Sequence, residues 1–295
     1  MKKTLKVLAL CMAAILALGM MVSCSAPAAK TSAPAETSAA APAETTAATP
    51  AEAEGEAVAA IKEKGKIVML TNAAFPPFEY LGSDNKPAGV DVDLAQEIAD
   101  SLGVELEVVD MDFDGLIAAL VAGKGDFVAA GMTVTDERKK SVDFADPYVT
   151  SAQYIIVKKG DTSIADAEGL KGKTVGVQKG TTGDMLASGE WDDTLIPAGH
   201  CEVEQYKSAI DAGMALVNGK LDAVIVDELP ARNIVETNSE VLALVEEPLT
   251  MEDYAFAVQK GSDLAAYISD QLNAMKESGK IDELVLKHSS ESSAK

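Results

Sequence analysis

The sequence predicts an α/β protein with two similar lobes, and two observations carry that prediction. The motif Leu-Val-x-Gly-Lys-x-Asp occurs at 120–126 and again at 216–222, each time before a short apolar run. The copies lie 96 positions apart, which indicates one duplicated helix–strand unit rather than a repeat array. Extended segments at 147–157 and 247–258 are separated by one whole lobe, and we expect them to be the two crossing strands of a hinge.

The first 57 residues are expected to lie outside the folded lobes. Residues 1–23 place lysines before an apolar run that is short for a membrane span, which is typical of a signal peptide. Small residues just before Cys24 indicate a lipoprotein signal with lipid on the Cys24 sulfur; ordinary secretion with an incidental cysteine is the alternative. Residues 24–57 are rich in Ala, Pro, Thr and Glu without apolar periodicity, and predict a disordered tether.

The rest of the chain is long enough for a core in each of two lobes. We expect lobe one to comprise 58–150 plus 252–295, and lobe two to comprise 151–251. The formal net charge of −22 argues against binding to nucleic acid or to an anionic lipid surface.

Cysteine and histidine usage argues against a disulfide and a metal site. Of three cysteines, one lies in the signal peptide and Cys24 is assigned to lipidation. Cys201 is left alone, so no intramolecular disulfide is expected. The two histidines, His200 and His288, lie far apart in sequence, and we expect neither to bind a metal.

Lobe one is expected to open with a strand over 66–71 and an aromatic loop. Two prolines hold the loop extended and fix the directions of its aromatic side chains. Aromatic residues make up only 4% of the chain, so their concentration here suggests a wall for a ligand. The aromatic residues are Phe75, Phe78 and Tyr80. A plug over the core is the alternative for the second and third of them.

An amphipathic helix is predicted to follow and to end at Gly103. Asp91 or Asp93 can cap its N-terminus. Its buried face repeats at i, i+4 and i+8, through Leu94, Ile98 and Leu102. A strand over 105–109 and a helix from Leu116 come next.

The stretch 126–148 carries the first candidate binding residues. A short apolar strand ends at Gly131, where the backbone can approach a ligand closely. Thr133 adds a hydroxyl, and Arg138 projects from the first turn of a second element that begins at Thr135. A backbone N–H, a hydroxyl and a guanidinium together suit a small carboxylate, because the guanidinium fork matches two oxygens. The alternative is a solvated charge run whose members pair with one another.

This stretch closely resembles the segment that grips the ligand α-carboxylate in the polar amino-acid-binding proteins of bacterial ABC importers, solute-binding family 3. The resemblance runs from about Lys66 to the C-terminus. It implies a periplasmic-binding-protein-like fold of type II, in which two α/β lobes are joined by a hinge of two crossing strands. It also implies that Phe75 and Phe113 face the ligand. Thr182, in the turn after the strand ending at Gln178, is implied to contribute to the carboxylate site, with Thr181 as the alternative.

The duplication adds an acidic residue to this site. It places Asp227 opposite Gly131, at the carboxyl end of a strand, where open α/β sheets bind ligands. One lobe would then offer Arg138 to a carboxylate and the other would offer Asp227 to an ammonium, which together recognise an α-amino acid. The alternative for Asp227 is an N-cap or a surface acid.

Two further residues bear on specificity. Asn72 stands where relatives that prefer cationic side chains often have Asp, and Gln178 is expected to face the side-chain pocket. Neutral groups at both places favour an uncharged, polar ligand similar to glutamine.

We therefore expect a monomeric lipoprotein, anchored outside the bacterial cell membrane, that delivers an amino acid to the permease subunits of an ABC importer without a cofactor or catalysis. One alternative is an enzyme resembling the cyclohexadienyl dehydratases, which needs a buried general acid or base. The nearest candidates for that role are Glu79 and Glu228, and both are expected at lobe edges. A second alternative is the ligand-sensing subunit of a receptor.

Overall fold

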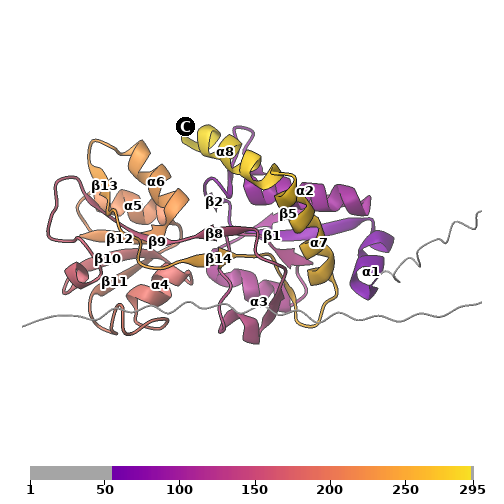
Figure 1. Cartoon of the computed structure of the whole chain (residues 1–295), viewed down its shortest axis with the longest axis horizontal. Coiled ribbons are helices and arrows are strands. Elements are labelled where there is room, and N and C mark those ends of the chain that lie inside the picture. Colours follow the sequence, from indigo (N-terminus) through magenta and orange to yellow (C-terminus); the bar gives the residue numbers. More distant parts are fainter. Residues whose placement is uncertain (1–54, 294–295) are drawn as a thin grey trace, which may run out of the picture. The chain divides into compact units, whose positions relative to one another are not determined.

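Two five-stranded sheets with the same pattern of strand order form the framework of residues 55–293, the part of the chain that this computed structural model describes (Figure 1). The first has the order β5-β1-β6-β15-β7 and the second β11-β10-β12-β9-β13. The first sheet contains β1 (Lys66–Thr71), β5 (Glu105–Asp110), β6 (Phe127–Val128), β7 (Val142–Phe144) and β15 (Ala257–Gln259). The second contains β9 (Gln153–Lys158), β10 (Thr174–Gln178), β11 (Glu202–Tyr206), β12 (Ala223–Asp227) and β13 (Leu242–Leu244).

The two sheets also share their strand directions. In each, a central strand has two parallel neighbours: β1 pairs with β5 and β6, and β10 pairs with β11 and β12. In each, the next strand is antiparallel: β15 pairs with β6, and β9 pairs with β12. Corresponding strands β6 and β12 follow the two copies of the duplicated motif. The predicted α/β fold with two lobes is confirmed.

Helices cover the sheets because each presents one apolar face. Those of the first half are α1 (Glu56–Lys64), α2 (Val90–Leu102) and α3 (Leu116–Val121), with the short turns η1 (Phe113–Gly115) and η2 (Arg138–Lys140). The second half contributes η3 (Glu168–Leu170), α4 (Thr182–Ala187), α5 (Ala209–Val217) and α6 (Glu228–Thr237), and the chain ends in α7 (Leu264–Glu277) and α8 (Lys280–Ser293). None of these helices is long and apolar enough to cross a membrane.

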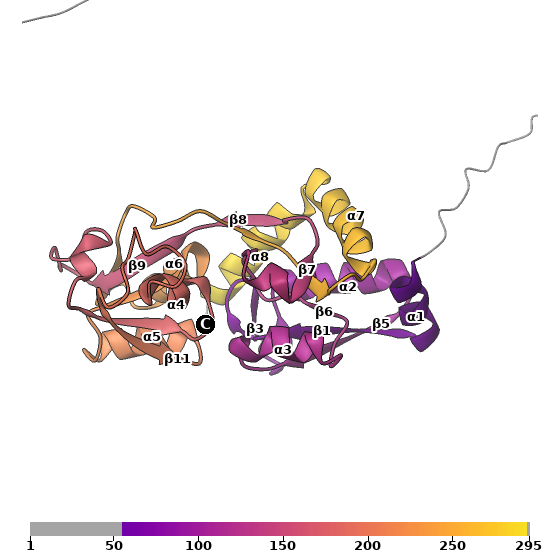
Figure 2. The ribbon, with the colours of Figure 1, turned by 90° about the horizontal axis from the view of Figure 1, so that it is seen from below.

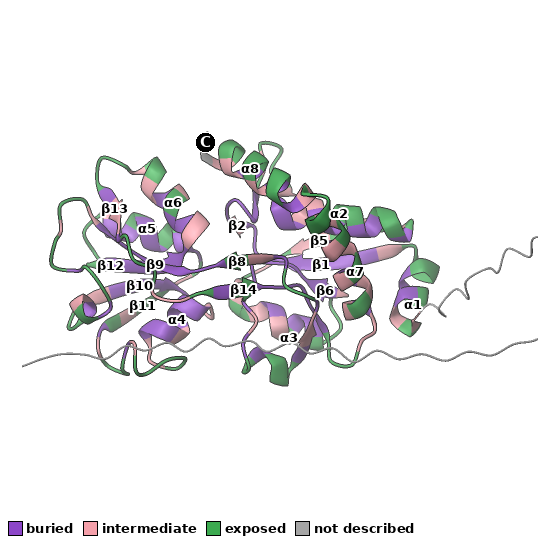
Figure 3. Ribbon diagram, viewed as in Figure 1, coloured by how far each residue is buried: buried purple, intermediate pink, exposed green. Residues whose placement is uncertain are grey.

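The central strands are buried on both faces, as Figure 3 shows by their purple colour. Ile67, Met69 and Leu70 of β1 are fully inaccessible to solvent, and all five residues of β12 are buried. Strands covered on both faces read as continuous apolar runs, which is why the sequence shows no alternation there.

Two paired strands carry the chain between the sheets. β8 (Val149–Ser151) lies antiparallel to β14 (Glu252–Tyr254), with Glu252 opposite Ser151. Figure 2 shows β8 running between the elements of the two sheets. These strands fall inside the two predicted crossing segments, so the hinge of two crossing strands is confirmed. A small sheet of β2 (Ala74–Phe75), β3 (Glu79–Leu81) and β4 (Pro87–Ala88) holds the aromatic loop.

The structure differs from the sequence-based expectation at the start of the folded part. Two residues assigned to the tether, Glu56 and Ala57, belong to α1, and Asp263 accepts a hydrogen bond from the Ala57 N–H at 3.0 Å. The signal peptide, Cys24 and the remainder of the tether lie outside the described residues. All described residues belong to one compact unit, and the exact lobe boundaries stay a prediction.

The C-terminal helix does not pack on lobe one alone. α8 contacts α2 in the first half and α6 in the second. Asn233 of α6 donates a hydrogen bond to Ser292 at 3.3 Å. α8 therefore touches both halves of the chain.

Candidate functional site

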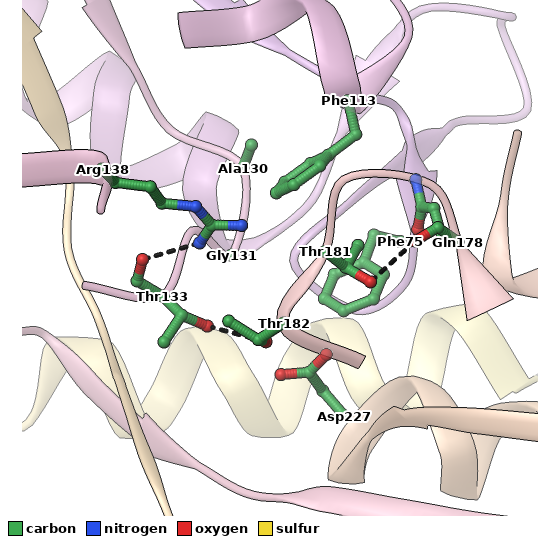
Figure 4. A pocket seen from close by; sticks show the side chains of 10 residues that line it. All are labelled: Phe75, Phe113, Ala130, Gly131, Thr133, Arg138, Gln178, Thr181, Thr182 and Asp227. Carbon is green, nitrogen blue, oxygen red and sulfur yellow. Dashed lines mark hydrogen bonds between the residues drawn. The ribbon is translucent and has the colours of Figure 1, made fainter. Parts of the chain in front are cut away.

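A small cavity, with a volume of about 10 Å³, lies where the carboxyl ends of strands from both sheets meet. A volume of this size holds about one water molecule, so the groups that line the cavity lie close together. Gly131 lies just beyond the end of β6, and Gln178 and Asp227 are the last residues of β10 and β12. The residues that line the cavity are Phe75, Phe113, Ala130, Gly131, Thr133, Arg138, Gln178, Thr181, Thr182 and Asp227 (Figure 4). The structure thus brings together eight of the nine predicted binding residues. The ninth, Asn72, adjoins the cavity through Gln178.

Arg138 enters this cavity from a tight turn. Its backbone N–H donates to the hydroxyl oxygen of Thr135 at 3.1 Å, as expected for a residue that begins the turn. The guanidinium donates through Nη1 to the Thr133 carbonyl at 2.6 Å and through Nη2 to the Gly180 carbonyl at 3.1 Å. It also lies over the ring of Phe113, 5.4 Å from the ring centroid. Arg138 is 5% exposed, so the predicted alternative of a solvated charge run does not describe it.

Burial acts on the charge of Arg138. Loss of contact with water lowers the pKa of its guanidinium to about 10, although the carboxylates of Glu252 and Asp227 oppose that shift. The hydrogen bonds that this cation donates to Thr133 and Gly180 go to carbonyl oxygens, which are neutral. Its positive charge is therefore available to an anion that enters the cavity.

Asp227 approaches the cavity from the opposite sheet, as Figure 4 shows. It occupies the N-cap position of α6, but its side chain makes no capping hydrogen bond. Instead Oδ1 accepts a hydrogen bond from the hydroxyl of Tyr254. Burial is the largest cause that raises the pKa of Asp227 to about 7, and the charge of Glu252 is the second. The alternative of a capping or surface role is thus excluded by the geometry.

Gly131 does not offer its N–H to the cavity. That N–H donates to Oδ2 of Asp91 at 2.9 Å, which corrects the reason for which the residue was proposed. Gly131 has φ of +52°, and a Cβ atom added there would lie 3.0 Å from the Phe75 ring. Glycine therefore leaves room for an aromatic ring that lines the cavity.

Two buried carboxyl groups behind the cavity were placed wrongly by the sequence. Asp91 or Asp93 was expected to cap α2, but Gly89 holds the cap position. Asp91 is fully buried and accepts from Gly131 and, at 2.6 Å, from the hydroxyl of Tyr148. Burial raises its pKa to about 6. Glu79 was expected at a lobe edge and is also fully buried, with a pKa well above its usual range because of burial and the nearby charge of Asp91. The burial of Asp91 could have been predicted from helical periodicity, because residue 91 lies three positions before Leu94 on the buried face of α2.

Gln178 and Asn72 join the two halves at one end of the cavity. Gln178 Nε2 donates to Oδ1 of Asn72 at 2.9 Å and to the carbonyl of Lys207 at 3.2 Å. Because a backbone carbonyl can only accept, the amide nitrogen must face Lys207, which fixes the orientation of the amide. Oε1 of Gln178 is then a buried acceptor without a partner among the described residues.

Thr133 and Thr182 share an acceptor that the sequence did not reveal. Both hydroxyls donate to Oε2 of Glu252, each at 2.7 Å. Glu252 lies on crossing strand β14 and is 4% exposed, yet it does not line the cavity. Thr181 caps α4, where its side chain accepts from the N–H of Asp184 at 3.3 Å.

Charged pairs also connect the two halves beside the cavity. Lys179 lies 2.8 Å from Asp114, and Lys207 lies 3.0 Å from Asp112. Among residues 55–293, no group of three or more His, Cys, Asp or Glu side chains is arranged to hold a metal ion. The cavity therefore presents one cation, one carboxyl group and two aromatic rings to a small organic ligand.

The fold and this cavity define a solute-binding protein with two lobes. Residues 67–291 match the family of bacterial extracellular solute-binding proteins, family 3, and the chain belongs to that family. This confirms the family expected from the sequence.

Relatives of the chain are named as amino-acid-binding proteins. The arginine-binding extracellular protein ArtP of Bacillus subtilis is 37% identical over 223 residues, which is 75% of this chain and 85% of the relative. The P235GK mutant of the arginine-binding protein ArgBP from T. maritima is 42% identical with a TM-score of 0.73, over 79% of this chain and 99% of that one. An ancestral arginine-binding protein, solved with glutamine bound, is 41% identical with a TM-score of 0.68, over 76% of this chain and 97% of that one.

Proposed function

We propose that this protein captures an L-α-amino acid between its two lobes and delivers it to an ABC importer. The observation that carries the proposal is the presence of Arg138 and Asp227 in one buried cavity, each from a different half of the chain. Burying a zwitterion is unfavourable unless both of its charges are paired. Arg138 would bind the α-carboxylate and Asp227 the α-ammonium, so only the complete amino acid satisfies both halves.

The side chain of the ligand should end in an N–H donor. The unpartnered Oε1 of Gln178 is an acceptor, and a carboxylate placed against it would be repelled. The neighbouring Asn72 is neutral, which favours the amide of glutamine. A guanidinium also supplies N–H donors, and the named relatives include arginine-binding proteins. Phe75 and Phe113 would pack on the aliphatic part of either ligand.

The test is thermal unfolding of the purified, ligand-stripped chain against the twenty amino acids, cystine and prephenate. Because a ligand that binds only the folded state raises the unfolding midpoint, binding is read directly as a shift. We expect glutamine or arginine to give the largest shift and glutamate to give none. If no amino acid shifts the unfolding midpoint, the proposal is contradicted. Turnover of prephenate would instead support the alternative of an enzyme that resembles the cyclohexadienyl dehydratases.

Variants of two arginines make that test specific. Arg138→Ala should weaken binding on the order of 100-fold or more, because it leaves a buried carboxylate unpaired. Arg138→Lys keeps the charge but loses the fork, and should recover only part of the affinity. Arg232 is the matched control: it is exposed on α6 and pairs with Glu228 at 2.8 Å. Arg232→Ala should bind as the unaltered protein does.

We also propose that lipid on Cys24 anchors the protein outside the cell membrane. The support is the sequence around that cysteine and membership in an extracellular binding family. Expression in a bacterial host followed by fractionation should place the protein with membranes, and Cys24→Ala should release it. An unchanged membrane fraction in that variant would contradict lipidation at this position.

A further inference from the structure

Glu252 lies behind the cavity at the meeting point of three elements. Its Oε2 accepts from Thr133, which follows β6, and from Thr182, which begins α4. Its Oε1 accepts from the hydroxyl of Thr250 at 2.8 Å. The carboxylate is thus buried with three donors, and two of these donors line the proposed ligand site.

These hydrogen bonds fix what the two threonines can offer to a ligand. A threonine hydroxyl carries a single hydrogen and two lone pairs. With both hydrogens directed at Glu252, the oxygens of Thr133 and Thr182 have only lone pairs left to offer. Gln153 Nε2 donates to the Thr182 oxygen at 3.1 Å, which further favours this orientation. The two hydroxyl oxygens can therefore accept from an ammonium but cannot donate to a carboxylate.

Turning the hydroxyls toward a ligand carboxylate would be costly. Glu252 would lose two of its three donors while remaining buried, and a second negative charge would arrive beside it. The charge of Glu252 is also one of the causes that raise the pKa of Asp227, so the two acids act on each other electrostatically. An incoming ammonium would instead gain from both negative charges.

We propose that Glu252 is a positioning residue that sets the hydroxyls of Thr133 and Thr182 as acceptors for the α-ammonium of the ligand. The inference rests on the proposed capture of an amino acid and deepens it. It reassigns these two hydroxyls, which the sequence had associated with the carboxylate, to the opposite end of the ligand. Arg138 remains the group that reads the carboxylate.

The experiment is calorimetric titration of the full chain and of Glu252→Gln with L-glutamine, L-arginine and the analogue of each that lacks the α-ammonium. Glu252→Gln should weaken binding of the complete amino acid on the order of 10- to 100-fold. It should change binding of the deaminated analogue by less than about threefold, because that analogue has no ammonium to lose. A purely structural role would reduce both affinities equally and would overturn the proposal, as would unchanged affinity for the amino acid.

Control variants separate the possible failures. Asp253→Asn removes the same charge from the next residue of β14, whose exposed side chain accepts from Thr150 at 2.8 Å, and should leave both affinities unchanged. If Glu252→Gln does not fold, Thr133→Val and Thr182→Val each remove one acceptor and should show the same selective loss. If the unaltered protein binds no amino acid, the proposed function itself fails. If the variants lose affinity equally for the complete amino acid and for its deaminated analogue, only the proposed role of Glu252 is contradicted.

Discussion

Burial acts in opposite directions on the two charged residues of the cavity. It lowers the pKa of Arg138 to about 10 and raises that of Asp227 to about 7, so in each case the charged form is disfavoured. A zwitterionic ligand reverses both effects because it brings the opposite charge to each residue. In the proposed function, this pairing of each residue with its opposite charge is the source of affinity.

The first prediction concerns pH and affinity. An ammonium binds the ionised form of Asp227, and this form becomes dominant as pH rises through about 7. Affinity should therefore rise between pH 5 and about 7 and then level off, by at most about tenfold per pH unit. Calorimetric titration across this range checks the profile, and Asp227→Asn should bind weakly with little dependence on pH. A flat profile in the unaltered protein would contradict the raised pKa.

Stability of the ligand-free protein should change with pH in the opposite sense. Asp227 has a pKa of about 7 when folded, against 3.8 for an ordinary aspartate, so between these values the folded state holds more protons than the unfolded state. The free energy of unfolding should therefore fall as pH rises through this window. Urea unfolding at several pH values measures it. Asp227→Asn should show a shallower fall, and Asp91, with a pKa of about 6, should account for part of the remainder.

A third prediction concerns Gly131. Replacement by alanine imposes φ of +52° on a residue with a Cβ atom and brings that atom to 3.0 Å from the Phe75 ring. We expect a loss of about 1–3 kcal/mol in unfolding free energy together with weaker ligand binding. Gly172→Ala is the control, because Gly172 also has positive φ but its added Cβ would meet nothing within 4 Å. If both variants lose only stability, the shape of the cavity does not depend on Gly131.

At this scale the sequence identified the charged residues but not the directions of their hydrogen bonds. Asp227 emerged because the duplication aligned it with Gly131, and Arg138 emerged from its spacing after Thr135. Glu252 remained hidden because it lies more than a hundred positions after Thr133 and next to it only in the fold. Which way a hydroxyl points depends on such distant partners, so residue type alone cannot give it.

At the scale of elements, the C-terminal helix α8 shows how a surface helix is held by buried polar contacts. His288 is 2% exposed; its Nε2 lies 2.9 Å from Asp93 of α2, and its Nδ1 lies 3.0 Å from the Tyr80 hydroxyl of β3. One imidazole thus ties three elements together. The sequence predicted α2 and its buried face well, since apolar periodicity depends on local spacing. It did not predict that α8 reaches α6, because that contact joins the two halves.

The fourth prediction follows from that imidazole. His288→Ala should cost about 1–3 kcal/mol of unfolding free energy, because it removes the hydrogen bonds of the ring and leaves a void where a buried side chain packs. Amino-acid affinity should stay within about threefold, since His288 does not line the cavity. Chemical unfolding and calorimetric titration measure the two effects separately. His200→Ala, which removes a partly buried ring bonded to the Ala167 carbonyl at 3.2 Å, provides the comparison.

At the scale of the whole molecule, contacts between the two halves surround the cavity. They comprise the amide pair of Asn72 and Gln178, the bond from Arg138 to Gly180, and the ion pairs of Lys179 and Lys207. Only a chain that brings its two sheets together can make them. The sequence predicted the two halves and the crossing strands between them, because duplication and extended segments are readable as patterns. The contacts between the halves involve residues in unrelated motifs.

The fifth prediction concerns the two lysines of these ion pairs. Their side chains are largely exposed, and exposed pairs contribute little and are screened by salt. Replacing Lys179 and Lys207 together by alanine should weaken amino-acid binding by less than about tenfold and should reduce its dependence on salt. Titrations at low and high salt measure both quantities. A loss as large as that of Arg138→Ala would show that the pairs do more than hold the halves together.

The duplicated unit also bears on how the site distinguishes one end of its ligand from the other. Gly131 and Asp227 occupy equivalent positions in the two copies, near the carboxyl ends of strands β6 and β12, in sheets with matching strand order. A chain with two identical halves would present the same group from both sides and would favour a symmetric ion. In the proposed function, the difference between the groups at these equivalent positions is what allows the site to tell the carboxylate end of an amino acid from its ammonium end.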